Sequence, residues 1–119
     1  MKQKRKLRAY IGGPMTGIPQ HNFPAFDAAR ADLERRGYAV VSPADIDRDF
    51  EITEERTAAL TGRFLKAVLI EELNEIFNCD VIFALPGWER SKGFAVEAAF
   101  ARCFGIPIIA YHAKDKSAA

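Results

Sequence analysis

The sequence contains little cysteine and no residue spacing typical of a metal site. Its 119 residues include only Cys79 and Cys103, whose spacing matches no metal-ligand motif. We therefore predict two reduced thiols in the core of a cytoplasmic protein, with neither a disulfide nor a bound metal. A chain of this length is large enough for one hydrophobic core, so residues 1–119 are predicted to form a single domain.

Long hydrophobic runs and an excess of charge of one sign are also missing. No apolar stretch approaches the roughly 18 residues that a membrane-spanning helix needs. The basic start, residues 2–8, leads directly into a predicted strand, so no signal peptide is expected. The formal net charge is only +1. This balance gives no support for a nucleic-acid or a membrane partner.

The common nucleotide-binding loops are missing as well. The glycine-rich segment GGPMTG, residues 12–17, is no Walker loop, because no Gly-Lys-Ser or Gly-Lys-Thr follows it. Gly12, Gly13 and Gly17 do not have the spacing of the dinucleotide fingerprint either, and no cofactor is expected. Backbone amides beside Gly13 and Gly17 could bind a phosphate or a sugar hydroxyl. The alternative is a tight turn that simply requires glycine torsions.

A strand, a helix and a second strand follow one another over residues 79–111. Residues 80–85 are an apolar run closed by Pro86-Gly87, which predicts a strand buried on both faces. Residues 91–104 have a helical pattern that Gly105 and Pro107 end, and residues 106–111 read as a second buried strand. This order predicts a right-handed unit with parallel strands.

The first half of the chain repeats this alternation. Strands are predicted at residues 7–12 and 38–41, with a helix between them that starts at Asn22 as N-cap. A second helix begins near residue 61, and the polar residues 45–56 are predicted to be a loop with at most a helical turn. The result is an α/β layered fold with a parallel sheet of four or five strands, in the order 2-1-3-4. The loops at 12–17 and 86–93 then converge where such sheets bind ligands, so a small-molecule site is expected there.

Glu97 is the only charged residue in the helical segment FAVEAAFA, residues 94–101. A carboxylate among Phe94, Val96 and Phe100 must be desolvated, paired or placed at the rim of a cleft. The early turns of a helix also favour an anion. The alternative is a glutamate that satisfies the helix dipole and faces solvent.

The loop before this helix supplies further candidate ligands. Ser91 offers a hydroxyl and Gly93 a flexible backbone. Trp88 could stack on a base, or it could close the edge of the hydrophobic core. His21, in the first loop, is expected to face solvent.

Several motifs occur together in this chain: YIGGPMTG at residues 10–17, NFPAF at 22–26, and CDV at 79–81 followed by GWERSKG at 87–93 and Glu97. In this combination the sequence resembles a domain family of phages and bacteria that belongs to the nucleoside 2-deoxyribosyltransferase-like superfamily. The resemblance covers nearly the whole chain apart from residues 45–56 and the tail. It implies a flavodoxin-like (Rossmann-like) three-layer fold.

The resemblance also implies residue roles, because characterised members of the superfamily break or exchange N-glycosidic bonds with a glutamate nucleophile. That glutamate corresponds to Glu97, and the residue six positions before it to Ser91. The tyrosine that binds the nucleophile corresponds to Tyr10. An aspartate of those enzymes corresponds to the longer Glu72, and the arginine that binds a 5′-phosphate in the nucleotide hydrolases corresponds to Thr16.

The expected activity is that of an N-glycosidic-bond enzyme, a deoxyribosyltransferase or an N-hydrolase, acting on a nucleoside or nucleotide. The alternatives are an NAD-type glycohydrolase and a non-catalytic nucleotide-binding or regulatory module. The expected catalytic residues are Glu97, Tyr10, Glu72 and Ser91, and the expected substrate-binding residues are Gly12, Gly13, Met15, Thr16, Gly17, Trp88 and Gly93.

The helix over residues 63–77 has an apolar face that looks wider than one sheet can cover. We therefore expect a homodimer or a larger homo-oligomer. The alternative is that residues 45–56 fold back and cover the surplus within one chain.

Overall fold

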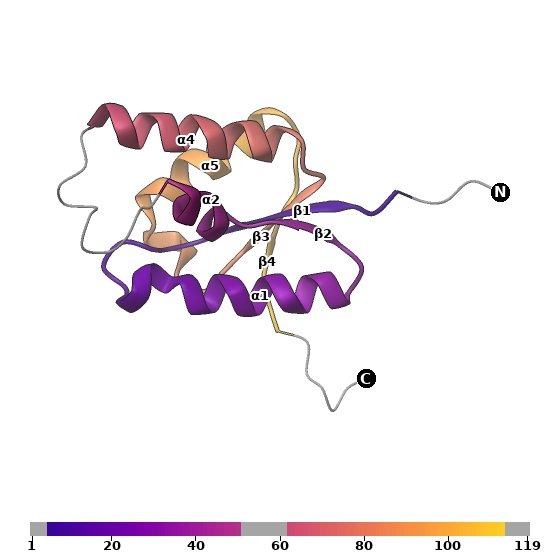
Figure 1. The fold of residues 1–119 in the computed structure, drawn as a ribbon. Helices are drawn as coiled ribbons and strands as arrows, with labels where there is room; N and C mark the ends of the chain where they lie inside the picture. The colour runs from indigo at the N-terminus through magenta and orange to yellow at the C-terminus, as the bar shows by residue number, and fades with distance from the viewer. Residues whose placement is uncertain (1–4, 51–61, 114–119) are drawn as a thin grey trace.

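A parallel sheet of four strands lies at the centre of the computed structural model, which describes residues 5–50 and 62–113 (Figure 1). The strand order is β2-β1-β3-β4, as predicted. In the middle of the sheet, Tyr10 pairs with Val41 on one side and Ile82 on the other. The strands are β1 (Arg8–Gly12), β2 (Ala39–Val41), β3 (Val81–Ala84) and β4 (Ile108–Ala110).

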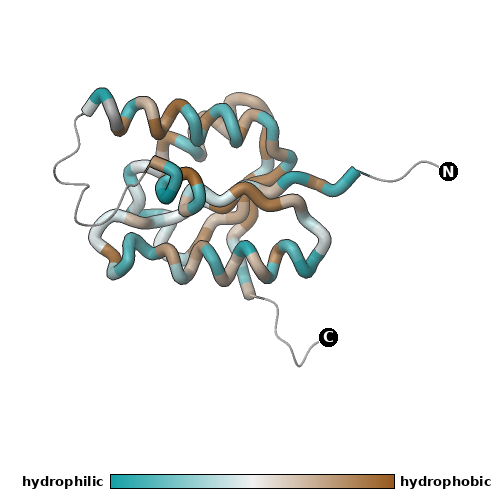
Figure 2. Tube along the Cα trace, viewed as in Figure 1, coloured by the Kyte–Doolittle hydropathy of each residue, from teal (hydrophilic) through white to brown (hydrophobic). Residues whose placement is uncertain are grey.

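Helices cover both faces of the sheet and complete the predicted α/β layered fold. Helix α1 (Phe23–Arg35) lies below the sheet in Figure 1, whereas α4 (Gly62–Phe77) and α5 (Lys92–Cys103) lie above it. The side chains of β1 alternate between the two layers, as strand geometry requires: Ala9 and Ile11 pack toward α1, and Tyr10 toward α4 and α5. Figure 2 shows the hydrophobic residues concentrated along the strands.

Two hydrophobic clusters, one on each face, hold the layers together. Both combine residues of β1 and β3 with residues of the helices that cover that face. The cluster toward α1 contains Ala9, Ile11, Phe26, Ala29, Leu33, Ala44, Val81, Phe83 and Leu85. The cluster toward α4 and α5 contains Tyr10, Ile76, Cys79, Ile82, Ala84, Phe94, Ala98 and Ala101.

A short helix follows β2 where the sequence predicted a loop. Helix α2 (Pro43–Asp49) begins at Ser42, whose hydroxyl accepts a hydrogen bond from the amide of Ala44 at 3.2 Å. Proline in the first turn suits this start. The loop prediction is therefore wrong for residues 45–49, and residues 51–56 lie outside the described part of the chain. The helix places Asp47 against the rest of the fold, where it is buried.

The last strand is less buried than the sequence predicted. All four residues of β3 are buried, as expected for a central strand. Ile109 of β4 is 48% exposed, because β4 is the edge of the sheet in this chain. Cys79 is buried, but Cys103 is exposed at the end of α5, so only one of the two thiols lies in the core.

None of the helices in residues 5–50 and 62–113 is long and apolar enough to cross a membrane.

Candidate active site

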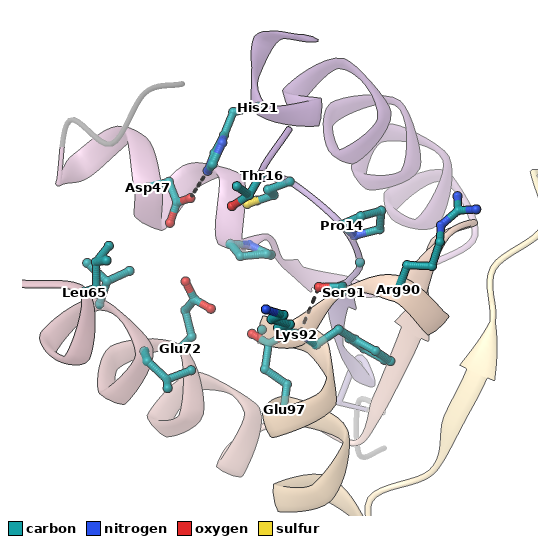
Figure 3. A pocket seen from close by; sticks show the side chains of 17 residues that line it. Pro14, Thr16, His21, Asp47, Leu65, Glu72, Arg90, Ser91, Lys92 and Glu97 are labelled. Carbon is teal, nitrogen blue, oxygen red and sulfur yellow. Dashed lines mark hydrogen bonds and ion pairs between the residues drawn. The ribbon is translucent and has the colours of Figure 1, made fainter. Parts of the chain in front are cut away.

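A pocket of about 560 Å³ opens at the carboxyl ends of β1 and β3 (Figure 3). It lies where open α/β sheets bind ligands, and its volume is in the range of small-molecule sites. Four segments supply its polar groups: the loop after β1, helix α2, the start of α5, and helix α4, which forms the opposite wall and carries Glu72. The lining residues are Gly13, Pro14, Met15, Thr16, His21, Pro43, Asp47, Leu65, Val68, Leu69, Glu72, Arg90, Ser91, Lys92, Gly93, Phe94 and Glu97.

A buried tyrosine and a buried glutamate meet at the base of the pocket. The hydroxyl of Tyr10 donates a hydrogen bond of 2.6 Å to Oε2 of Glu97. Tyr10 is fully buried and Glu97 is only 3% exposed. The pKa of Glu97 is raised above its usual value, chiefly by burial, and the neighbouring groups of Glu72 and Tyr10 offset only part of this shift. Glu97 therefore does not face solvent as a dipole-satisfying residue would.

Glu72 brings a second carboxyl group into the same cluster. Its Oε2 lies 3.4 Å from the hydroxyl of Tyr10. Burial, followed by the neighbouring carboxyl group of Glu97, raises the pKa of Glu72 to about 10. At neutral pH Glu72 therefore holds a proton beside Glu97.

Tyr10 completes this proton arrangement. Burial, followed by the charges of Glu97 and Glu72, raises its pKa well above the usual value for a tyrosine. Its hydroxyl thus stays protonated and directs its one hydrogen to Glu97. The cluster places two buried carboxyl groups, one of them protonated at neutral pH, beside a tyrosine hydroxyl, and a nucleophile and a general acid can be drawn from such a pair.

His21 and Asp47 form a second polar pair in the pocket lining. Nε2 of His21 lies 3.3 Å from Oδ2 of Asp47, and the exposed fractions of the two side chains are only 7% and 6%. The prediction that His21 faces solvent is therefore wrong. Its backbone explains the difference: Gln20, His21 and Asn22 all have positive φ, which makes a left-handed turn before α1.

Asn22 occupies the N-cap position of α1, but it does not cap the helix through its side chain as predicted. Its side-chain amide instead donates a hydrogen bond of 2.8 Å to the carbonyl of Pro14. This bond ties the loop after β1 to the start of α1.

Asp47 was not predicted from the sequence as a site residue, because it lies in the segment predicted to be a loop. Ser42-Pro43, a helix-start signal, was the available cue.

The loop after β1 contributes Gly13, Met15 and Thr16 to the lining. Gly12 is required by close packing: a Cβ on it would lie 2.2 Å from Cε1 of Phe94. There is also no room for a side chain at Gly13, because an added Cβ would lie 2.8 Å from Cβ of Leu85. Gly17 has a φ of +84° and nothing within 4 Å of an added Cβ, which is typical of a turn residue.

Ser91 and Gly93, at the start of α5, also line the pocket. The hydroxyl of Ser91 accepts a hydrogen bond of 3.1 Å from the amide of Phe94 and so caps the helix that carries Glu97. Trp88 lies elsewhere: it lines a second pocket of about 360 Å³, and its ring packs edge-on against Phe94 at 5.9 Å between centroids. The structure therefore places Trp88 at the core edge and not beside Glu97.

Asp80 directly precedes β3, at the end of the strand opposite to the pocket, and its contacts there are structural. Its carboxylate accepts hydrogen bonds from Arg5 at 3.1 and 3.2 Å and from the amide of Arg8 at 2.7 Å.

Among the residues that the structure describes, no group of three or more His, Cys, Asp or Glu side chains could hold a metal ion.

The comparisons with known proteins agree with this fold. A family model described as a domain of unknown function (DUF4406) matches residues 7–110. Among solved structures, the 2-deoxyribosyltransferase of Bacillus psychrosaccharolyticus is similar, with a TM-score of 0.60 and 19% identity over 85% of this chain and 69% of that chain. This likeness shows a shared α/β flavodoxin-like fold. No curated protein matches the chain.

Proposed function

The chain belongs to the family described as a domain of unknown function (DUF4406), and from its site we propose that it breaks or exchanges the N-glycosidic bond of a nucleoside or nucleotide. The observation that carries this proposal is the proton arrangement at the base of the pocket. Glu97 is buried, Tyr10 donates a hydrogen bond to it, and Glu72 holds a proton beside it. The fold shared with a 2-deoxyribosyltransferase supports the same chemistry.

In the first half-reaction Glu97 acts as the nucleophile. Its carboxylate attacks the anomeric carbon of the sugar, the bond from that carbon to the base nitrogen breaks, and the electron pair leaves with the base. The base takes the proton of Glu72. A glycosyl ester of Glu97 and a neutral free base are the products of this step.

The second half-reaction reverses these roles. Water or a second base attacks the anomeric carbon, the ester bond breaks, and Glu97 regains its carboxylate. The proton of the incoming group returns to Glu72, as microscopic reversibility requires. Whether the protein is a hydrolase or a transferase depends on which acceptor enters the pocket.

The activity is tested by incubating the protein with nucleosides, nucleotides and NAD and following the free base by chromatography. Release of base from a nucleoside or nucleotide, or its exchange for an added base, is the expected result. Release of nicotinamide from NAD alone would instead indicate a glycohydrolase of dinucleotides. If no substrate loses its base, the proposed activity is wrong.

Glu97→Ala should lower turnover by at least about a hundredfold, because the nucleophile is removed. Glu89→Ala is the matched control, since Glu89 is an exposed glutamate in the loop before the same helix. Circular dichroism should show that both variants retain the fold. A Glu97→Ala variant with the wild-type rate would contradict the assignment of the nucleophile.

A further inference from the structure

Asp47 and His21 lie in the pocket but have no part in the proposed chemistry. Both side chains are more than nine-tenths buried. Besides the contact of 3.3 Å between them, Oδ1 of Asp47 and Nδ1 of His21 are buried without a hydrogen-bond partner among the described residues. A buried polar atom without a partner is costly, and at a pocket wall a ligand can supply the missing bond.

His21 positions Asp47 at the expense of backbone strain. Gln20, His21 and Asn22 have φ values of 57°, 55° and 60°. This left-handed conformation is unfavourable for residues other than glycine. The bond from Asn22 to Pro14 holds the turn, and Phe23 packs edge-on against the imidazole at 5.6 Å between centroids. Strained backbone conformations of this kind occur most often at functional sites, where they hold a functional side chain in position.

Asp47 lies next to the carboxyl cluster. Figure 3 shows its carboxylate between His21 and Glu72, with the oxygen not bonded to His21 on the side of Glu72. The negative charge of Asp47 contributes to the raised pKa values of Tyr10, Glu72 and Glu97. The wall of the pocket therefore presents a hydrogen-bond donor, the protonated Glu72, beside an acceptor, the carboxylate of Asp47.

A base that binds to this wall of the pocket needs a hydrogen-bond acceptor that faces Glu72, next to a hydrogen-bond donor that faces Asp47. Adenine has that pattern on one edge, where N7 accepts and the exocyclic N6 amino group donates. N7 is also a position at which a proton makes a purine a better leaving group. An oxo group at the 6-position, as in hypoxanthine, would place a second acceptor against Asp47 and leave the carboxylate oxygen unpaired.

We propose that Asp47, positioned by His21, selects 6-aminopurine substrates over 6-oxopurine substrates. The inference rests on the proposed function, because it assigns the base of that same reaction. Glu72 would protonate N7 while Asp47 accepts a hydrogen bond from the N6 amino group.

The test compares 2′-deoxyadenosine with 2′-deoxyinosine, and adenosine with inosine, since each pair differs at the 6-position of the base. The wild type should prefer the amino substrate by about tenfold or more in kcat/KM, the effect of one lost hydrogen bond in a buried site. Asp47→Asn should reduce or invert the preference, because the amide can turn its NH₂ group toward an oxo group. Asp49→Asn, an exposed position on the same helix, is the control and should leave the preference unchanged.

Variants of His21 separate a positioning role from a purely structural one. His21→Phe keeps a ring but removes the hydrogen-bond donor, so the preference should fall, and His21→Gln should restore part of it. A purely structural role would lower the rates on both substrates together and leave their ratio unchanged. An unchanged ratio in His21→Phe would therefore overturn the positioning role.

Binding of free bases to the wild type gives a readout that needs neither turnover nor a folded variant. Calorimetry should show adenine binding more tightly than hypoxanthine and than unsubstituted purine, which lacks the amino group. If no nucleoside is cleaved but this order holds, the proposed function fails and the base selection stands. If nucleosides are cleaved but both purine pairs react equally, or Asp47→Asn keeps the full preference, the base selection is wrong and the proposed function stands.

Discussion

The proton on Glu72 makes the stability of the protein depend on pH. The pKa of this carboxyl group is raised from 4.5 to about 10 in the folded state. Between these two values the unfolded chain has lost the proton and the folded chain still holds it. The free energy of unfolding therefore falls as the pH rises through this window, and the contribution of Glu72 is fully present only below it.

Glu72→Gln removes that titration, so its melting temperature should fall less than that of the wild type from about pH 5 to about pH 9. Differential scanning calorimetry across the range measures the difference. Glu71→Gln is the control, because Glu71 is exposed on the same helix, and its pH profile should follow the wild type. Parallel profiles for wild type and Glu72→Gln would show that Glu72 does not hold the proton.

Thr16 bears on the requirement for a 5′-phosphate. It lines the pocket without a charge at the position where the resemblance places an arginine in nucleotide hydrolases. Arg90 and Lys92 also line the pocket, but both are exposed, where ion pairs with a phosphate are weakened by solvent. We expect a nucleoside and its 5′-monophosphate to differ by no more than about tenfold in kcat/KM. Cleavage of the monophosphate alone would contradict this expectation.

At the scale of elements, the contact between β1 and α5 depends on Gly12. A methyl group there would overlap the ring of Phe94, a residue only 2% exposed on the helix that carries Glu97. Gly12→Ala should destabilise the protein by about 1–3 kcal/mol, the usual cost of overpacking a core. Urea denaturation measures the change. Gly62→Ala, with nothing within 4 Å of the added methyl group, is the control and should be neutral or slightly stabilising.

The elements with strong hydrophobic patterns could be predicted from the sequence, and the polar ones could not. The strand order followed from the alternation of apolar strands with helices, and Glu97 was noticed because it is the single charge in an apolar helical segment. Helix α2 has no such pattern, since Ser42 and Pro43 start it locally and contacts with α1 and α4 position it. The inward direction of His21 depends on a left-handed turn, a conformation that among residues 20–22 only Asn22 favours. The Asp47–His21 pair therefore arises from tertiary structure.

At the scale of the molecule, apolar side chains remain exposed on the face formed by α4 and α5. Phe77 of α4 and Phe104 after α5 are 57% and 56% exposed, and their rings meet at 5.5 Å between centroids. Ile70 and Val96 are 60% and 44% exposed on the same two helices. Residues 45–49 form α2, which contacts α4 but leaves these four side chains exposed, and residues 51–56 lie outside the described part of the chain. Soluble proteins usually keep exposed apolar patches small unless a partner covers them.

We therefore propose that the chain forms a homodimer or a larger even assembly through this face, because an isologous pairing would bury the patch on both copies. Size exclusion coupled to light scattering at micromolar concentration should give at least twice the chain mass of 13.3 kDa. Phe104→Glu places a charge in the patch and should shift the protein to the monomer. Leu7→Glu, which adds the same charge at a residue that is 53% exposed before β1, should not. A wild-type mass of 13.3 kDa would show that the exposed face of α4 and α5 does not join two copies.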